Sequence, residues 1–226
     1  MGRYEQLKST MQELNLKPKD VLRHWIITKE VDSDTLEDIF CGLEIDASLE
    51  PQVGWFAFSD GIFAPRPDVY PNLLGIIAWL NPCATAKEGE RGIILIPKCH
   101  TGKWAKGYGR TGVNRSQDGH GNTERLASLE TSHIKYPAAS VCANYSSECI
   151  NKGEAFLPAV EQLVTIVSNA KLIRNAMQKL GKTFMGKLWS STEYTSHYAY
   201  VVDVETQEVQ GVSKVKDCDY YSILTF

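Results

Sequence analysis

Long apolar runs are absent from the sequence, which argues against a membrane-spanning helix. Such a helix needs about 20 consecutive apolar residues, whereas the longest candidate, LLGIIAWL at 73–80, is less than half as long. The N-terminal stretch, MGRYEQLKSTMQEL, likewise has no apolar signal-peptide region. We therefore expect no membrane span, and either a chain that is not exported by the signal-peptide route or one that is already mature.

Basic residues are not in excess either. Lysine and arginine number 24, against 27 aspartates and glutamates, so the formal net charge is −3 at pH 7. Proteins that bind nucleic acid usually carry a basic surplus, and this composition disfavours that class. No CxxC pair occurs among the six cysteines, which disfavours a zinc knuckle. Their even number leaves both disulfides and free thiols open.

The sequence does contain enough apolar material for a core, with 43% hydrophobic and 10% aromatic residues in a chain of 226. Its pattern changes near residue 49. Helical periodicity dominates residues 1–48, whereas the alternation typical of strands begins after Pro51. We predict a helical N-terminal segment, 1–48, and a larger domain, 49–226. The acidic residues of the segment's third helix disfavour DNA binding and favour packing or docking onto a partner subunit.

The larger domain is patterned as strands, then helices, then strands, which predicts an α+β fold. An Asp-Gly turn at 60–61 indicates a hairpin, and a second turn is expected at Thr206–Gln207. Helices are expected from about Asn122 and from Pro158. The apolar stripe of the helix after Pro158 should comprise Val160, Leu163, Val164 and Val167. Strands are expected at 73–80, 91–97, 197–205, 208–215 and 220–226.

A glycine-rich basic segment, residues 98–123, separates the first strands from the helices. Its lysines and arginines are interleaved with Trp104 and Tyr108, a pattern that can bind phosphates or stack on bases. Long loops are otherwise often merely solvated. We therefore favour a surface loop pinned by one buried tryptophan, and keep a binding role as the alternative.

The sequence offers little that favours catalysis or metal binding. Cys99 precedes His100, but neighbours on a strand point to opposite faces and cannot form a nucleophile–base pair. The other histidines lack the spacing of a metal site, and SQDGHGN at 116–122 lacks the calcium-loop pattern. We therefore expect no catalytic residue, no metal ion and no cofactor.

Several short motifs occur in order along the chain. They are SDG at 59–61, GI at 75–76, DGHGNT at 118–123, YPAA at 136–139, FLPAVEQL at 156–163, WSSTEY at 189–194 and AY at 199–200. In this order they resemble the C-type-lectin-like domains of bacterial surface and fimbria-associated proteins of the major-paralogous-domain type. The chain is also similar to the variable proteins of diversity-generating retroelements. The resemblance covers about residues 52–226 and implies a C-type-lectin-like fold.

The chain departs from the family pattern in places. Its last strand, YYSILTF, lacks the arginine-containing phrase YVRPV that is common in the family. AFLP at 155–158, with Phe156, stands where the family usually has WYLP or WRLP. The EPN and WND motifs of calcium-dependent sugar binding are absent, so the resemblance carries over no calcium site.

The resemblance also implies a structural role for the WSSTE motif. In the family fold this segment is expected to form a loop that returns through the core. Trp189 would be its buried anchor, and Glu193 would accept hydrogen bonds from two backbone amides. The hydroxyls of Ser190, Ser191 and Thr192 would bond the loop's own backbone, because irregular buried backbone must find partners.

A binding face is expected beside this scaffold. Tyrosine, serine and histidine with few apolar residues make up adaptable binding surfaces. The predicted face comprises Tyr194, Ser196, His197, Tyr198, Lys214, Lys216, Asp217, Asp219 and Tyr221. The alternative is that these are ordinary polar loop residues.

These features favour a non-enzymatic recognition protein that binds a protein or glycan receptor. The resemblance to variable proteins implies diversification by a retroelement. The resemblance favours a cell-surface, secreted or virion location. The alternative is a structural or adaptor subunit of a bacterial surface or phage-like assembly, docked through residues 1–48; oligomerisation stays open. An oxidase of the formylglycine-generating type is less favoured, because it needs a close reactive cysteine pair and Cys142 and Cys149 are seven residues apart.

Overall fold

The computed structural model describes residues 50–59, 61–68, 72–83, 91–129 and 135–226. The predicted helices of residues 1–48, and their boundary with the larger domain, lie outside these ranges. Within the described ranges, no helix combines the length and the apolar character that crossing a membrane requires.

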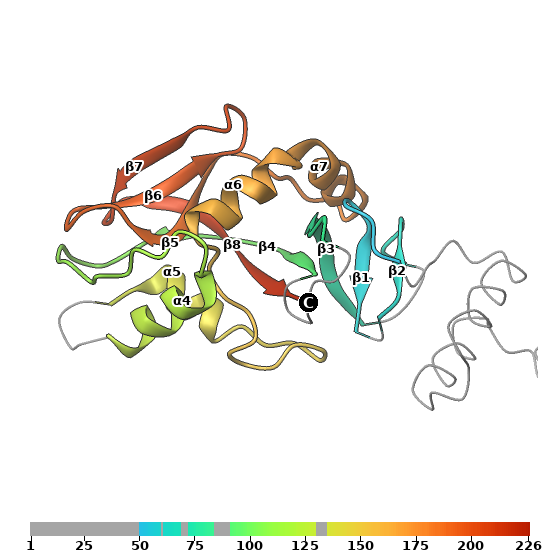
Figure 1. The fold of residues 1–226 in the computed structure, drawn as a ribbon, viewed down its shortest axis with the longest axis horizontal. Helices are drawn as coiled ribbons and strands as arrows, with labels where there is room; N and C mark the ends of the chain where they lie inside the picture. The colour runs from blue at the N-terminus through green and yellow to red at the C-terminus, as the bar shows by residue number, and fades with distance from the viewer. Residues whose placement is uncertain (1–49, 60, 69–71, 84–90, 130–134) are drawn as a thin grey trace, which may run out of the picture.

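A mixed sheet of eight strands forms the centre of the structure (Figure 1). The strands are β1 (Phe56–Phe58), β2 (Phe63–Ala64), β3 (Leu73–Leu80), β4 (Gly92–Lys103), β5 (Lys187–Glu193), β6 (Tyr198–Asp203), β7 (Val209–Ser213) and β8 (Asp217–Thr225). Their spatial order is β2-β1-β3-β4-β8-β5-β6-β7. Neighbouring strands run antiparallel except for β5 and β8, which are parallel. The C-terminal strand therefore lies in the interior of the sheet.

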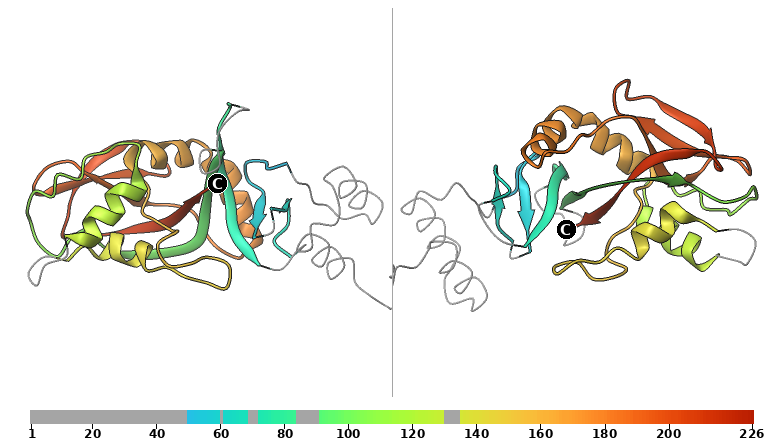
Figure 2. Two further views of the ribbon diagram at one scale, coloured as in Figure 1. Left: turned by 60° about the horizontal axis from the view of Figure 1, so that its bottom comes forward. Right: turned by 180° about the vertical axis from the view of Figure 1, so that it is seen from behind.

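Four helices cover the sheet in the described part of the chain. They are α4 (Gly119–Ser128), α5 (Pro137–Ala143), α6 (Val160–Ser168) and α7 (Ala170–Lys179). The first two lie on one side of the sheet and the last two on the other (Figures 1 and 2). One buried cluster joins α6 and α7 to the sheet, and a second, which contains Trp104 and Trp189, joins α4 and α5 to it. This arrangement confirms the predicted α+β class.

Helix α6 shows how packing selects among competing apolar residues. Its sequence, VEQLVTIVS, has more apolar residues than one face can hold. Leu163, Ile166 and Val167 are buried, whereas Val164 is 38% exposed. The predicted stripe was therefore wrong at Val164 and omitted Ile166.

Helix α4 begins before the predicted start at Asn122. Asp118 is the N-cap, and its Oδ1 accepts a hydrogen bond from the backbone N of Gly121 at 2.8 Å. Gly119 permits the close approach to α6, because a Cβ there would stand 2.5 Å from Gln162 Oε1. Asn122 is instead buried, and its Nδ2 donates to the carbonyl of Arg115 at 2.6 Å.

Strand β4 is longer than predicted. The polar residues 98–103 were expected to begin a loop, but they continue the strand and pair with β8, from Cys99 opposite Tyr221 to Lys103 opposite Asp217. A strand needs backbone partners more than an apolar sequence, and β8 supplies them. The loop proper is therefore residues 104–118, and β8 begins at Asp217.

The two predicted hairpins are present, although Asp60 of the first turn lies outside the described residues. β1 and β2 pair antiparallel, and Gly61 between them has a φ of 77°. β6 and β7 also pair, and Gln207 in their turn has a φ of 61°. Asp203 Oδ1 accepts from the backbone N of Thr206 and of Glu205, and these bonds lower the pKa of Asp203.

Candidate functional site

A buried ion pair, Glu193 with Lys214, contacts the loop 104–118. The Glu193 carboxylate accepts hydrogen bonds from the backbone N of Thr111 at 2.9 Å and of Gly112 at 3.1 Å. It also pairs with the Lys214 ammonium, which donates in addition to the carbonyl of Gly109 at 2.8 Å. Burial lowers the pKa of Lys214, while the bond to Glu193 and its charge act in the opposite direction. The pair therefore ties the loop to both β5 and the β7–β8 turn.

Two buried tryptophans reinforce this junction. Trp104 Nε1 donates to the carbonyl of Ser190 at 2.8 Å, and Trp189 Nε1 donates to the carbonyl of Gly102 at 2.9 Å. The Lys214 ammonium lies 4.8 Å from the centre of the Trp104 ring, a cation–π contact. Trp104 thus bonds the backbone of β5, and Trp189 of β5 bonds the backbone at the end of β4. The loop is pinned by a buried tryptophan, as the sequence predicted.

The WSSTE motif lies in β5 and does not form the predicted loop. Its hydroxyl groups were expected to bond the backbone of their own segment, but most of their hydrogen bonds are to other segments. Ser190 Oγ donates to the carbonyl of Tyr200 at 2.9 Å, and Thr192 Oγ1 donates to that of Arg115 at 3.1 Å and accepts from the backbone N of Val160 at 3.0 Å. Ser191 Oγ accepts from Asn122 Nδ2 at 3.3 Å. The motif is thus a central strand whose side chains satisfy neighbouring irregular backbone.

Two residues of the predicted binding face are buried, so the expectation that they are exposed is wrong. Lys214 is 0% exposed because it completes the pair with Glu193. Tyr221 is 4% exposed, packs against Phe184 and donates its hydroxyl to the carbonyl of Thr183 at 3.0 Å. Both belong to the scaffold.

Three predicted residues, Lys216, Asp217 and Asp219, lie at the start of β8 or in the turn before it. Asp219 is half-buried in β8, where its Oδ1 accepts from Thr101 Oγ1 at 2.5 Å. Lys216 and Asp217 are exposed at the β7–β8 turn, and the backbone N of Lys216 donates to the carbonyl of Ser213 at 2.9 Å. This turn adjoins the exposed aromatic residues described next, because the backbone N of Lys214 donates to the carbonyl of His197 at 3.0 Å.

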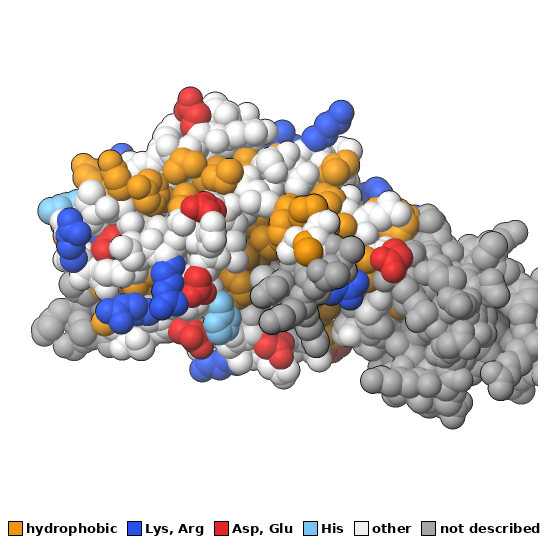
Figure 3. Space-filling model, in the orientation of Figure 1, with side chains coloured by type: hydrophobic (Ala, Val, Ile, Leu, Met, Phe, Trp, Pro, Cys, Tyr) orange, Lys and Arg blue, Asp and Glu red, His pale blue; other side chains and the backbone are white. Residues whose placement is uncertain are grey.

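An exposed aromatic face consists of Tyr108, Tyr194, His197 and Tyr198. The exposed fractions of the three tyrosines are 49%, 54% and 45%. Tyr108 packs on His197 with ring centres 4.7 Å apart, and its hydroxyl lies 3.2 Å from Ser213 Oγ. Because Ser213 pairs with Tyr198 across β6 and β7, these side chains are contiguous. Hydrophobic side chains gather over β6 and β7 in Figure 3.

The turn that carries this face is held by many short-range bonds. The backbone N of Tyr194 and of Thr195 both donate to the carbonyl of Tyr198, at 3.0 and 2.9 Å. Thr195 Oγ1 accepts from the backbone N of His197 and of Tyr198. Ser196 Oγ lies 2.9 Å from His197 Nδ1, and its carbonyl accepts from the backbone N of Gly109. The aromatic side chains therefore project from a pre-organised turn.

Sequence reasoning omitted Tyr108 from the binding face and did not pair Lys214 with Glu193. Tyr108 carries one weak signal, since glycines flank it in KGYGR and a tyrosine there has little local packing to bury it. Lys214 lies at the end of a short predicted strand. The alternation of polar and apolar residues along that strand does not distinguish a solvent-facing lysine from a buried one. Only the fold brings Glu193 within reach of it.

Gly211 supports the face from below, because the Tyr194 ring lies over it and packs on Tyr200 with ring centres 4.8 Å apart. An alanine at 211 would place its Cβ 2.7 Å from Tyr194 Cδ1. We expect Gly211→Ala to displace the Tyr194 ring while the sheet stays folded. The measurement is the NMR shift of the Tyr194 ring protons together with the melting temperature. Unchanged ring shifts would contradict this placement.

The histidine, cysteine and carboxylate side chains of the described residues do not gather into a metal site. The described residues contain no group of three or more histidine, cysteine, aspartate or glutamate side chains that could hold a metal ion. Cys99 lies near Tyr221 and His100 stacks on Tyr220, so the two point to opposite faces of β4 as predicted. Burial raises the pKa of Cys99 and lowers that of His100. These shifts favour the uncharged thiol and imidazole.

Comparison with known proteins gives a likeness to a solved structure. No protein-family model and no curated protein matches the chain. Among solved structures, a fimbrial protein from Bacteroides ovatus ATCC 8483 is similar at 16% sequence identity with a TM-score of 0.61. The match covers 78% of this chain and 49% of that protein, so the chain spans about half its length. At this identity the likeness shows a shared fold alone.

Proposed function

We propose that the protein is a non-enzymatic subunit of a bacterial surface assembly. The observation that supports this is the fold shared with a fimbrial protein over 78% of the chain. The burial of the polar WSSTE residues in the scaffold agrees with it, since those residues stabilise the sheet and loop and leave no reactive group exposed among them. What the protein binds within such an assembly depends on the residues exposed on its surface.

Within that role, the aromatic face is the surface that binds a protein or glycan receptor. Exposed tyrosines bury much area on contact and lose little conformational entropy, because they have few rotatable bonds. Tyr108, Tyr194 and Tyr198 combine this property with a turn whose backbone is already ordered. Pre-organisation of this kind lowers the entropic cost of binding.

The C-type-lectin-like assignment, and kinship with retroelement variable proteins, belong to the same proposal. Both are supported by the contrast between the buried residues of WSSTE and the exposed residues that follow it. Trp189 and Glu193 are buried and bond distant backbone, whereas Tyr194, His197 and Tyr198 directly after them are exposed. A rigid support beneath variable side chains is what a diversified binding protein requires.

The test is binding of the labelled protein to printed glycan and protein arrays and to intact bacterial cells. On any hit, Tyr198→Ala should weaken binding about 30-fold, equivalent to about 2 kcal/mol, because truncated aromatic anchors cost that much. Its melting temperature should be almost unchanged, since exposed substitutions alter stability by about 0.5 kcal/mol. Tyr108→Ala should behave in the same way.

The matched control is Met185→Ala, which truncates a side chain of similar exposure, 56%, that lies before β5 and outside the face. It should leave both binding and stability unchanged. Wild-type binding that survives both tyrosine substitutions would place the receptor site elsewhere. An absence of any surface or receptor binding would overturn the recognition role and leave a purely structural subunit.

A further inference from the structure

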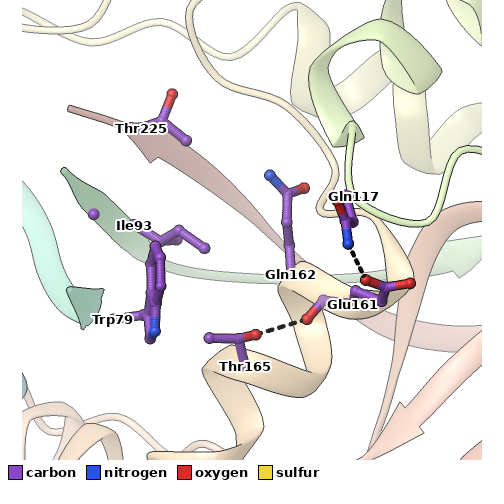
Figure 4. Close-up of a pocket in the computed structure, with 8 residues that line it drawn as sticks. Trp79, Ile93, Gln117, Glu161, Gln162, Thr165 and Thr225 are labelled. Atoms are coloured by element: carbon purple, nitrogen blue, oxygen red, sulfur yellow. Dashed lines mark hydrogen bonds between the residues drawn. The ribbon is translucent and has the colours of Figure 1, made fainter. Parts of the chain in front are cut away.

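A cavity of about 520 Å³ lies beside α6, away from the aromatic face. Its lining comes from three adjacent strands, from α6 and from the loop before α4: Trp79, Gly92, Ile93, Thr225, Glu161, Gln162, Thr165 and Gln117. Figure 4 shows Trp79 and Ile93 on one side, and Gln162, Glu161 and Gln117 on the other. The volume is within the range of about 300–1,000 Å³ that small-molecule sites occupy.

Trp79 and Ile93 give the strand side of the cavity an apolar surface. Trp79 is half-buried against the core, and Ile93 is buried beside it. Gly92 allows this surface to stay close-packed, because a Cβ there would stand 2.6 Å from the carbonyl oxygen of Trp79 and 2.7 Å from the Phe226 ring. An aromatic ring with one accessible side offers a platform for an apolar ring face.

The helix side carries hydrogen-bonding groups that are already oriented. Gln162 Oε1 accepts from the backbone N of Ala159 at 2.9 Å and of Gly119 at 3.1 Å. Because both bonds use the oxygen, the amide nitrogen of Gln162 points into the cavity (Figure 4). Among the described residues no partner is recorded for that nitrogen, so its two protons can donate to a ligand.

The acceptor is equally well placed. Gln117 Nε2 donates to Glu161 Oε2 at 2.6 Å, which orients the carboxylate at the rim. Hydrogen bonds from Ser116 and Gln117 lower the pKa of Glu161, so it is ionised at neutral pH. Thr165 Oγ1 donates to the carbonyl of Glu161 at 2.9 Å and thus keeps its lone pairs for accepting. The helix side therefore combines a hydrogen-bond donor, the amide nitrogen of Gln162, with two acceptors, the Glu161 carboxylate and the Thr165 hydroxyl.

We propose that this cavity binds one ring of a neutral saccharide, with the ring's C–H face on Trp79 and its hydroxyls on Gln162 and Glu161. A sugar ring has an apolar face and an edge of hydroxyls that both donate and accept, which matches the two sides of the cavity. Among the described residues no lysine or arginine lines it, whereas Glu161 is anionic, so phosphates and acidic sugars are disfavoured. The site is separate from the aromatic face and does not rest on the receptor role proposed above.

The test titrates the full chain with methyl glycosides of glucose, galactose, mannose and N-acetylglucosamine, with their β-linked disaccharides, and with sialyllactose. Binding is followed by saturation-transfer NMR and by tryptophan fluorescence. The methyl glycosides represent a free sugar and the disaccharides a glycan chain, so tighter binding of the latter identifies a glycan as the source. We expect at least one neutral probe to bind and sialyllactose not to bind.

Three variants locate the site. Glu161→Gln should weaken binding about tenfold, because it removes a charge-assisted hydrogen bond while Gln117 can still donate to the new amide oxygen. Thr225→Val, which keeps the strand's shape, should weaken it less. Glu208→Gln is the matched control, since Glu208 also accepts from a glutamine side chain, that of Gln210 at 3.1 Å, on the distant β7 edge. Trp79→Leu should abolish binding, with the melting temperature checked for each variant.

The outcomes separate this site from the aromatic face. Binding weakened in Glu161→Gln but unchanged in Tyr198→Ala and Glu208→Gln supports the cavity. Binding lost only in Tyr198→Ala assigns the sugar to the aromatic face and overturns the proposal. So does preference for sialyllactose, or no neutral probe bound at millimolar concentration. A short peptide that binds here in place of sugars would also overturn it.

Discussion

Replacing Glu193 with alanine is expected to lower the free energy of unfolding by about 3–5 kcal/mol, the usual cost of removing one partner of a buried ion pair. The substitution leaves the Lys214 charge buried and frees the backbone N of Thr111 and of Gly112 from their acceptor. For a chain of 226 residues this corresponds to a fall in melting temperature of about 10 °C. Chemical denaturation and thermal melting both measure it.

Two further variants test the cause of this loss. In Glu193→Ala with Lys214→Met, part of the stability should return, because no unpaired charge remains buried. Glu205→Ala is the matched control: Glu205 also accepts from a backbone amide, that of Gly186, and pairs with Arg174 at 3.5 Å, but it is exposed. It should cost no more than about 1 kcal/mol. An unchanged melting point for Glu193→Ala, with receptor binding lost, would make Glu193 a binding residue.

Replacing Trp189 with alanine is expected to have an effect of similar size, about 3–5 kcal/mol, because it empties a fully buried site. The loss should also release the loop, since the indole donates to the carbonyl of Gly102. Trp189→Phe serves as the comparison, because it keeps most of the volume and removes the hydrogen bond. It should cost clearly less than alanine. Equal losses for the two would mean that the bond, and not the packing, anchors the loop.

Local patterns predicted the elements whose partners are near in sequence. The Asp-Gly turn, the β6–β7 hairpin around Thr206–Gln207 and the apolar strand β3 follow from turn chemistry and alternation. The α6 and α7 helices follow from apolar spacing and from Pro158 ahead of them. The α+β class follows from the order of these elements.

Errors occurred where the partner is distant. Residues 98–103 have a polar sequence typical of a loop, yet they form a strand because β8 lies beside them. Helix α4 begins at Gly119, with Asp118 as its N-cap, because Gly119 lets the start of the helix approach Gln162. Val164 lost its place in the core to Ile166 because the sheet meets only one face of α6.

By itself the sequence determined the order of strands and helices and the turns, and the resemblance of its WSSTE motif implied the buried role of Trp189 and Glu193. Only the tertiary structure decided that WSSTE is a central strand, that Lys214 is buried and that Tyr108 joins the exposed face. A charge is stable in a core only when its partner and its backbone donors arrive together. Here the partner is 21 residues away in sequence and the donors about 80, in Thr111 and Gly112. Local sequence patterns do not report contacts between residues so far apart. Only the tertiary structure therefore shows which of these residues are buried in the scaffold and which are exposed on the surface.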